Sequence, residues 1–507
     1  MANKKIISVI TSALLFTSIL LTACTTKEGQ KTVQKDTLVV ANAMETKSLD
    51  PQNANDGSST RAGMAIYDRL VERSEDMKLV PGLAENWENK DANTWIFNLR
   101  KGVKFHNGEE LKASDVKFTL ERQKKSSRVG FLVSSIDTVE TDGDYKVIIK
   151  TKEPFAPLLS NLAHNGSAIL NEKAVKAAGE DYGQKPVGTG PFKLTQWVAG
   201  DKMVLERFDE YFGGKAGVKN LIFKTVPEAS SRTIGLETGE IDISVDIEPV
   251  DKEKIKSNSK LKMEQTPTLG YANIWLNNAK KPFDNKLVRQ AINYAINKDA
   301  IINSVLYGVG EKANTVLAPL VFGYNKDIKG YEYNVQKAKE LLAQAGYTNG
   351  FECKLWVSSS TSQIGEVIQA QLKEVGINVK IESLETSAGL ERTGKGEHDM
   401  YIGGWTTVTA DPDYGLYPTY HSSQKGPAGN RSFYGNAEVD KLLDLGRKTI
   451  DEQERIKIYK EAQKLIVEDA ADVQLYFPGR IVGMQKNIEG FTVHPASYHR
   501  FNKVTFK

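Results

Sequence analysis

The sequence predicts a mixed α/β protein with a partly parallel sheet. Segments rich in β-branched residues alternate with segments whose apolar residues recur at helical spacing along most of the chain. In the second half, two helical segments end at the C-cap glycines Gly346 and Gly376, and a strand-like segment follows the second at 377–384. Since parallel strands are usually joined through a helix, these repeated units favour an α/β lobe with parallel neighbours.

Length and composition indicate a soluble globular protein of more than one domain. The chain has 507 residues, of which 40% are hydrophobic and 26% are charged. Sixty-seven Lys and Arg residues against 64 Asp and Glu residues leave a net charge of +3. Because no strong positive field results, composition gives no reason to expect a nucleic-acid partner.

The amino terminus predicts export. Lys4 and Lys5 precede the apolar run Ile6 to Leu21, which is too short and too polar for a membrane span. Its end, "LTAC", resembles the lipobox of bacterial lipoproteins, which implies a signal peptide over 1–23 and a lipid on the thiol of Cys24. The polar segment 24–35 is expected to be a flexible tether to the membrane.

In the first half, the strand expected at 36–43 is followed by a helix at 57–72. Ser59 and Thr60 stand at the start of this helix, which is expected to face a cleft or solvent. In the segment 94–111, Trp95, Phe97 and Leu99 and then Val103 and Phe105 alternate in strand period before the turn signal "HNG". A helix capped by Ser114 is expected next.

In the second half, one helical stripe is expected to run from 284 to 306. The closing segment 471–495 returns to short strands, as if the chain crossed back to the first lobe.

The sequence contains no recognisable motif for catalysis or metal binding. The six histidines are scattered, and no phosphate loop or nucleophile elbow is present, so no catalytic residue, metal or cofactor is predicted. Asp411 and Asp413 flank a proline, a spacing typical of a turn in which Asp caps the backbone. Cys353, the second of two cysteines, is expected to pack in a strand as a small hydrophobe, without a disulfide.

Four stretches together resemble one family. The segment Leu79 to Arg122 is similar to the signature region of the extracytoplasmic solute-binding proteins of family 5, the peptide and nickel receptors of ABC importers. Three later stretches resemble further landmarks of that family in the same order: "PVGTGPFKL", "PFDNKLVRQAINYAINKDAI" and "GWTTVTADPD". The resemblance extends over Asp36 to Lys507.

This resemblance implies a two-lobed, periplasmic-binding-protein-like fold of type II, with an enlarged first lobe and a hinge of two crossovers. Lobe I is expected at 36–272 with a return at 481–507, and lobe II at 273–480. The implied protein is a monomeric receptor rather than an enzyme. It is lipid-anchored outside the cytoplasm, at the outer face of the membrane or in the periplasm, and delivers a peptide to ABC permease and ATPase subunits.

The segment Gly403 to Gly415, called the "GW" loop after Gly404 and Trp405, gives the expectation for the ligand. Dipeptide receptors of the family place an aspartate three residues after this tryptophan, where it pairs with the ligand's α-amino group, but here that position is Val408. Family members that bind glutathione lack this aspartate too and carry a small residue followed by threonine, so Val408 with Thr409 is closer to them. In the alternative that stays open, Val408 packs inward and Asp411 or Asp413 holds the amine.

Arg61 and Arg431 are the candidates for the carboxylates of glutathione. The candidate ligand contacts are Ser59, Thr60, Arg61, Trp405, Thr406, Thr407, Val408, Thr409, Asp411, Asp413 and Arg431. A receptor for a nickel chelate or haem, and a signalling or hydrolytic lipoprotein on the same fold, are the alternative functions.

Overall fold

The computed structural model describes residues 35–507. The expected signal peptide, Cys24 and nearly all of the expected tether lie outside the described residues. Residues Asp36–Lys507 form one compact unit with its own hydrophobic clusters.

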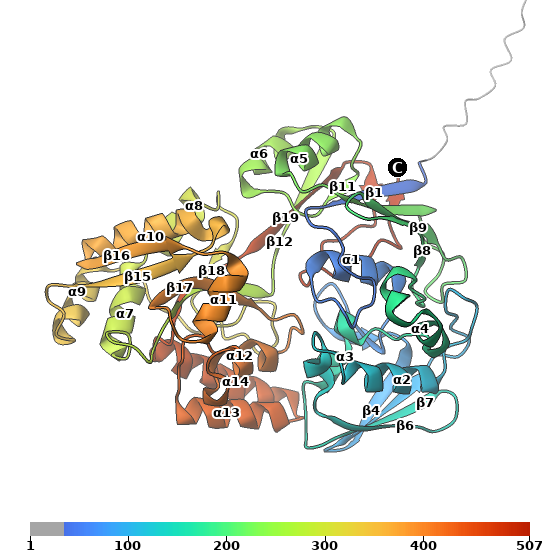
Figure 1. Ribbon diagram of the computed structural model, residues 1–507, viewed down its shortest axis with the longest axis horizontal. Helices are drawn as coiled ribbons and strands as arrows, with labels where there is room; N and C mark the ends of the chain where they lie inside the picture. Colours follow the sequence, from blue (N-terminus) through green and yellow to red (C-terminus); the bar gives the residue numbers. More distant parts are fainter. Residues whose placement is uncertain (1–34) are drawn as a thin grey trace, which may run out of the picture. The chain divides into compact units, whose positions relative to one another are not determined.

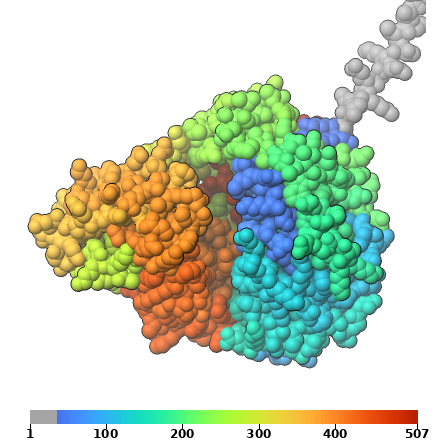
Figure 2. All heavy atoms as spheres, viewed as in Figure 1, coloured from blue at the N-terminus to red at the C-terminus, as the bar shows by residue number. Residues whose placement is uncertain are grey.

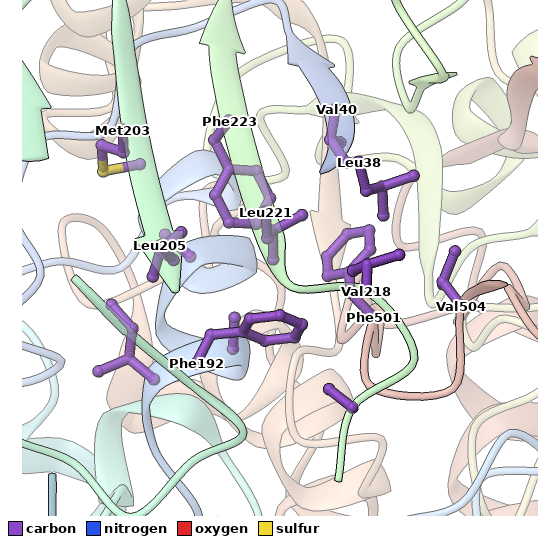
Figure 3. Packing of buried hydrophobic residues seen from close by; sticks show 14 of the residues in the cluster. Leu38, Val40, Phe192, Met203, Leu205, Val218, Leu221, Phe223, Phe501 and Val504 are labelled. Atoms are coloured by element: carbon purple, nitrogen blue, oxygen red, sulfur yellow. The ribbon is translucent and has the colours of Figure 1, made fainter. Parts of the chain in front are cut away.

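The β1 sheet organises the first part of this unit. Its strand order is β12-β19-β11-β1-β10-β9-β8, with β1 parallel to β10 and β11 and the other pairs antiparallel. The strands are β1 (Thr37–Asn42), β8 (Phe192–Val198), β9 (Lys202–Arg207), β10 (Asn220–Thr225), β11 (Ile243–Ser244), β12 (Leu261–Pro267) and β19 (Gly479–Gln485). Figure 3 shows Leu38 and Val40 of β1 packed with Phe501 and Val504, so the end of the chain completes this core.

A second, antiparallel sheet follows α1 (Gly57–Ile66) in the chain. This β5 sheet has the order β4-β5-β7-β6, and α2 (Ala113–Gln123) packs on it. Its strands are β4 (Ala84–Asp91), β5 (Thr94–Leu99), β6 (Ile136–Thr141) and β7 (Lys146–Thr151). The smaller elements of this part are β2 (Val71–Arg73), β3 (Leu79–Pro81), α3 (Leu158–Leu162), α4 (Glu172–Ala178), α5 (Ala229–Thr238), α6 (Lys252–Ser257), β20 (Ile488–Glu489) and β21 (Thr505–Phe506).

The β13 sheet organises the remaining part, with the order β14-β18-β13-β17-β15-β16. β15 is parallel to both β16 and β17, which confirms the partly parallel sheet that the sequence predicts. Cys353 packs in the apolar cluster of this sheet, as expected. The strands are β13 (Gly270–Leu276), β14 (Glu311–Lys312), β15 (Phe351–Val357), β16 (Ile377–Ser383), β17 (Met400–Thr406) and β18 (Val473–Phe477).

Helices accompany the β13 sheet in two groups (Figure 1). The first group is α7 (Lys286–Ala295), α8 (Lys298–Ser304), α9 (Val335–Gln344), α10 (Ser362–Glu374) and α11 (Thr386–Gly394). The second group is α12 (Pro412–Tyr420), α13 (Ala437–Lys448) and α14 (Glu452–Glu468), which follow the "GW" loop and share a separate apolar cluster. Met77, from the turn between β2 and β3, also packs in that cluster.

Two adjacent crossovers join the β1 sheet to the β13 sheet. The chain passes from β12 to β13 across Thr268 and Leu269, and it returns from β18 to β19 across Pro478. The two crossovers touch, because the backbone N–H of Thr268 donates to the carbonyl oxygen of Pro478 (3.0 Å). The boundaries expected at 272/273 and 480/481 fall inside β13 and β19, a few residues beyond these crossovers.

Three local predictions need correction. The helix expected at 57–72 ends at Ile66, and Val71 begins β2. Ser114 lies inside α2, whose N-cap is Lys112; the Asp115 carboxylate accepts from the Lys112 backbone N–H (3.0 Å). The single stripe expected at 284–306 is two helices, because Asn297 caps α8 by accepting from the N–H of Ala300 (3.0 Å).

Candidate ligand-binding cleft

The "GW" loop begins at the end of β17, beside the crossover strand β13. Trp405 lies opposite Tyr271 in this antiparallel pair. Gly403 and Gly404 permit close packing there, since a Cβ on Gly403 would lie 2.8 Å from the Trp275 ring and one on Gly404 would lie 2.5 Å from the Tyr271 carbonyl oxygen. Figure 2 shows a hollow between the blue atoms around α1 and the orange atoms of the β17 and α11 region. We call this hollow the cleft.

The loop itself offers little charge to a ligand. Trp405 is partly buried, and its Nε1–H donates to the carbonyl oxygen of Tyr414 (2.9 Å). Thr406 is exposed and Val408 is half-buried, whereas Thr407 and Thr409 are buried. The loop therefore presents an aromatic wall, one exposed hydroxyl group and an apolar side chain.

Both aspartates of the loop have arginine partners. Asp411 caps α12 and pairs through both carboxylate oxygens with Arg455 (2.8 and 2.6 Å). Asp413 pairs through both oxygens with Arg447 (2.9 and 3.1 Å). The expected turn and cap are present, but each carboxylate already has a bidentate cation and is buried.

The environment moves the two carboxyl pKa values in opposite directions. Burial favours the neutral form of Asp411, but the charge and hydrogen bonds of Arg455 outweigh it, so the pKa lies below its ordinary value. For Asp413, burial dominates and raises the pKa in spite of Arg447. Neither carboxylate therefore lacks a cationic partner that a ligand amine could supply.

The helix α1 holds the candidates of the other wall. Ser59 is not the cap: Asp56 is, and its Oδ1 accepts from the backbone N–H of Ser59 (2.9 Å) while its Oδ2 accepts from the Ser59 hydroxyl (2.8 Å). Ser59, Thr60 and Arg61 are all buried. Arg61 donates from Nε to Asn42 (2.9 Å) and from Nη2 to Asp246 (3.1 Å), so its positive charge is matched within the protein.

Arg431 differs from Arg61 in that no described carboxylate pairs with it. Its guanidinium lies 5.7 Å from the centre of the Trp275 ring, and its Nε has no hydrogen-bond partner among residues 35–507. Burial lowers the pKa of Arg431, although a guanidinium keeps its proton. Of the two arginines expected from the sequence, Arg431 is the one whose guanidinium is available.

Contacts at the end of the cleft away from the crossovers join the β5-sheet side to the α12–α14 side. The hydroxyl of Ser160 donates to Asp411 (3.2 Å), and the backbone N–H of Ala156 donates to the carbonyl oxygen of Arg447 (2.9 Å). Phe131 stacks on Tyr414 with ring centres 5.3 Å apart. We call these contacts the latch.

The latch partners and the two arginines that pair with the loop aspartates escaped sequence reasoning. Arg447 and Arg455 are 34 and 44 positions from their carboxylates, and Ser160 is 251 positions from Asp411. Nothing in the local pattern around these residues separates them from surface side chains. Only the arrangement of α12, α13 and α14 against the β5-sheet side brings them together.

Among residues 35–507, no cluster of three or more histidine, cysteine, aspartate or glutamate side chains could hold a metal ion. In the same range, none of the helices has the length and apolar character needed to cross a bilayer.

Comparison with known proteins identifies the family. The sequence profile of the bacterial extracellular solute-binding proteins, family 5 (middle region), matches residues 78–427. The chain belongs to this family. Its members are receptors that bind solutes, which agrees with the resemblance found in the sequence.

Curated relatives of the chain include peptide receptors. It is 32% identical to the dipeptide-binding protein of Escherichia coli, over 94% of this chain and 95% of the relative. It is 34% identical to the glutathione-binding protein GsiB of Pectobacterium atrosepticum, over 92% and 93% of the two chains. Both similarities extend over more than nine tenths of each chain.

Solved structures support the fold class. The periplasmic binding protein DppA of Helicobacter pylori, solved in complex with the peptide STSA, superposes with a TM-score of 0.81 at 34% identity and covers 93% of this chain and 98% of its own. HbpA2 of Haemophilus parasuis gives a TM-score of 0.85 at 30% identity, over 93% and 100%. The two-lobed α/β binding-protein fold is thereby confirmed.

Proposed function

We propose that this protein is the lipid-anchored, extracytoplasmic receptor of an ABC importer and captures short peptides in the cleft. The observation that carries the proposal is the cleft between α1 and the β17 region, where the "GW" loop begins. The parts of the chain on either side of the cleft are joined by a pair of touching crossovers. A ligand that contacts both walls favours the closed state, because closure adds contacts to both. The names of relatives that bind dipeptides and glutathione support the same ligand class.

Within this class, glutathione is the ligand that the loop favours. An ordinary peptide amine placed beside Val408 would lose hydration without an anionic partner. Asp411 and Asp413 offer no ready substitute, since Arg455 and Arg447 already neutralise them. The only free amine of glutathione lies on its γ-linked glutamate, displaced from the position of an ordinary α-amine.

The carboxylates of the ligand need hydrogen-bond donors, and the guanidinium of Arg431 serves as the donor to one of these carboxylates. Its guanidinium has no carboxylate partner among residues 35–507, and it lies near Trp275 of the crossover strand β13. Arg61 instead holds Asp246 and thereby fixes α1 against the β1 sheet. Thr406 offers a neutral hydrogen bond, and Trp405 offers a flat apolar wall.

Anchoring and delivery complete the proposed function. A lipid on Cys24 would hold the receptor beside its permease and raise its effective concentration there. The permease and ATPase subunits of the importer are the proposed protein partners, and the receptor acts as a monomer. The two crossovers serve as the hinge, since a few residues suffice to absorb the rotation of lobe closure.

Ligand identity can be tested directly. The protein is purified without added peptide, and native mass spectrometry identifies whatever ligand remains bound. Calorimetry then compares glutathione with Ala-Ala and with a tripeptide of ordinary linkage, and we expect glutathione to bind most tightly. Tight binding of ordinary dipeptides together with no binding of glutathione would contradict the choice of ligand; no binding of any peptide would contradict the proposed function.

A further inference from the structure

Arg480 holds a special place in the hinge. It is the second residue of β19, directly after the crossover at Pro478. It lies opposite Thr266 of β12, so the two crossover strands together fix its backbone. A residue at this place stays next to both lobes as they open and close, because the rotation occurs around it.

The positive charge of Arg480 has no acidic partner of its own among residues 35–507. Its guanidinium donates a hydrogen bond to the hydroxyl of Ser497. Asp246 is the carboxylate whose field reaches it, but Asp246 already accepts from Arg61 (3.1 Å) and from the backbone N–H of Ala43 (3.2 Å). Burial and the nearby charge of Arg61 lower the pKa of Arg480, which indicates that the surroundings disfavour its charge.

His499 adds a hydrogen-bond donor to these surroundings and no negative charge. Its Nδ1 accepts from the backbone N–H of His494 (3.1 Å), so in the neutral ring the proton is on Nε2. This buried Nε2 has no hydrogen-bond partner among the described residues. Burial, together with the charges of Arg480 and Arg61, holds the pKa of His499 well below its ordinary value, so the ring is neutral.

The group formed by Arg61, Arg480, His499 and Asp246 thus carries two guanidinium charges against one carboxylate, with an unused donor. Asp56 is a second carboxylate, but its charge acts on Arg61. A partly buried cation without an anionic partner is costly, and an added carboxylate would offset that cost. The planar fork of a guanidinium matches a carboxylate in two hydrogen bonds. We infer that Arg480 is a specificity-determining residue of the cleft, which binds one carboxylate of the peptide ligand at the hinge.

This inference rests on the proposed function and extends it. Glutathione has two carboxylates, and a peptide receptor that uses Arg431 alone would leave one of them unpaired. Arg431 belongs to the segment before α13, whereas Arg480 belongs to the crossover strand β19. A ligand held by Arg431 and Arg480 together would connect the β13-sheet part to the hinge. Its binding would then depend on each of the two ligand carboxylates.

The test compares glutathione with two blocked analogues, one esterified at the glycine carboxylate and one amidated at the glutamyl α-carboxylate. Calorimetry is performed on the full-length protein in mild detergent. We expect the unmutated protein to bind glutathione more tightly than either analogue. Arg480→Gln should weaken glutathione binding about 10- to 100-fold and leave binding of one analogue unchanged, so that the preference over that analogue is lost.

Three variants make the result specific. Arg431→Gln should abolish the preference over the other analogue, and Arg480→Lys should restore part of the preference because it keeps the charge. Arg207→Gln is the matched control, since Arg207 ends β9 in the same sheet and already pairs with Asp209 (2.7 Å); it should bind like the unmutated protein. A merely structural role of Arg480 would lower the affinity for all three ligands equally, and that result would overturn the inference.

Failure of the inference can be told from failure of the proposed function. If the unmutated protein prefers ordinary dipeptides, the same comparison is made between a dipeptide and its carboxy-terminal amide. If the Arg480→Gln variant still prefers ligands with free carboxylates over the blocked analogues as strongly as the unmutated protein does, the role of Arg480 is overturned while the receptor function stands. If the unmutated protein binds no peptide at all, the proposed function and this inference are both wrong.

Discussion

Ser160 donates a hydrogen bond to the carboxylate of Asp411 that Arg455 also holds, across 251 positions of sequence (3.2 Å). Asp411 at the same time caps α12, which begins where the "GW" loop ends. The "GW" loop is therefore connected to the β5-sheet side through one carboxylate. This contact links the latch directly to the loop that we propose binds the ligand.

The first prediction concerns this link. Ser160→Ala should lower the affinity for the peptide ligand about three- to tenfold, because the lost hydrogen bond to a charged acceptor stabilises the closed arrangement. Calorimetry provides the affinity, and Ser257→Ala is the control because the exposed Ser257 hydroxyl bonds only its own helix, to Lys254. An unchanged affinity in Ser160→Ala would show that the Ser160–Asp411 hydrogen bond does not contribute to closure.

The second prediction concerns the Asp411–Arg455 pair. Arg455→Met leaves a buried carboxylate without its cation and should lower the free energy of unfolding by about 3–5 kcal/mol. The double variant Asp411→Asn with Arg455→Met should recover part of this loss, since no unpaired charge is then buried. Urea denaturation gives both values, and equal stability of the single and double variants would contradict the argument.

The same pair predicts a dependence on pH. The pKa of Asp411 is lower in the folded protein than its ordinary value of 3.8, so ionised Asp411 stabilises the fold above that value. This contribution should be lost as the pH falls through the lower, folded-state pKa. Stability measured from pH 7 down to pH 2 should therefore fall less steeply in the double variant than in the unmutated protein, and identical slopes would contradict this.

The third prediction concerns ligand choice at Val408. Val408→Asp supplies the missing anion, so affinity for ordinary dipeptides should rise about tenfold while affinity for glutathione should fall. Val408→Asn is the control, because it adds a polar group of similar size without charge. Calorimetry with glutathione and Ala-Ala measures the change. Equal responses of the aspartate and asparagine variants would show that charge at this position does not select the ligand.

The fourth prediction concerns anchoring, on a residue outside the described part of the chain. Cys24→Ala should abolish incorporation of a labelled fatty acid and release the protein from membranes or leave an uncleaved precursor. Cys353→Ala is the matched control, since Cys353 is buried and burial raises the pKa of its thiol to about 12. Label that persists in Cys24→Ala would contradict the lipid assignment.

The fifth prediction concerns the hinge. A chain without residues 1–34 retains every described strand and helix, and it should become more compact when a saturating ligand closes the cleft. Small-angle scattering measures the radius of gyration before and after addition of the ligand to protein freed of bound peptide. An unchanged radius would argue against closure about the two crossovers.

Local sequence patterns determined several of the helices and strands in the described part of the chain. The strand at 377–383 follows Gly376 as expected, and the parallel pairing of β15 with β16 followed from the helix between them. Local patterns gave wrong helix boundaries where another residue provides the N-cap. Asn297 caps α8 and divides the stripe at 284–306, and Asp56 takes the cap position expected near Ser59. Family membership also followed from the sequence, because several quoted stretches occur in the family's order.

The sequence by itself also placed a neutral valine at position 408, where the resemblance to dipeptide receptors leads us to expect an acid. Only the tertiary structure decided which charged groups are available to a ligand. Asp411 and Asp413 are paired by arginines of α14 and α13, and Arg61 is paired by Asp246, 185 positions away. A charged side chain is available to a ligand only if folding brings no oppositely charged group close to it. The reason is that the Coulomb energy of two charges depends on their distance in space and not on their separation along the chain.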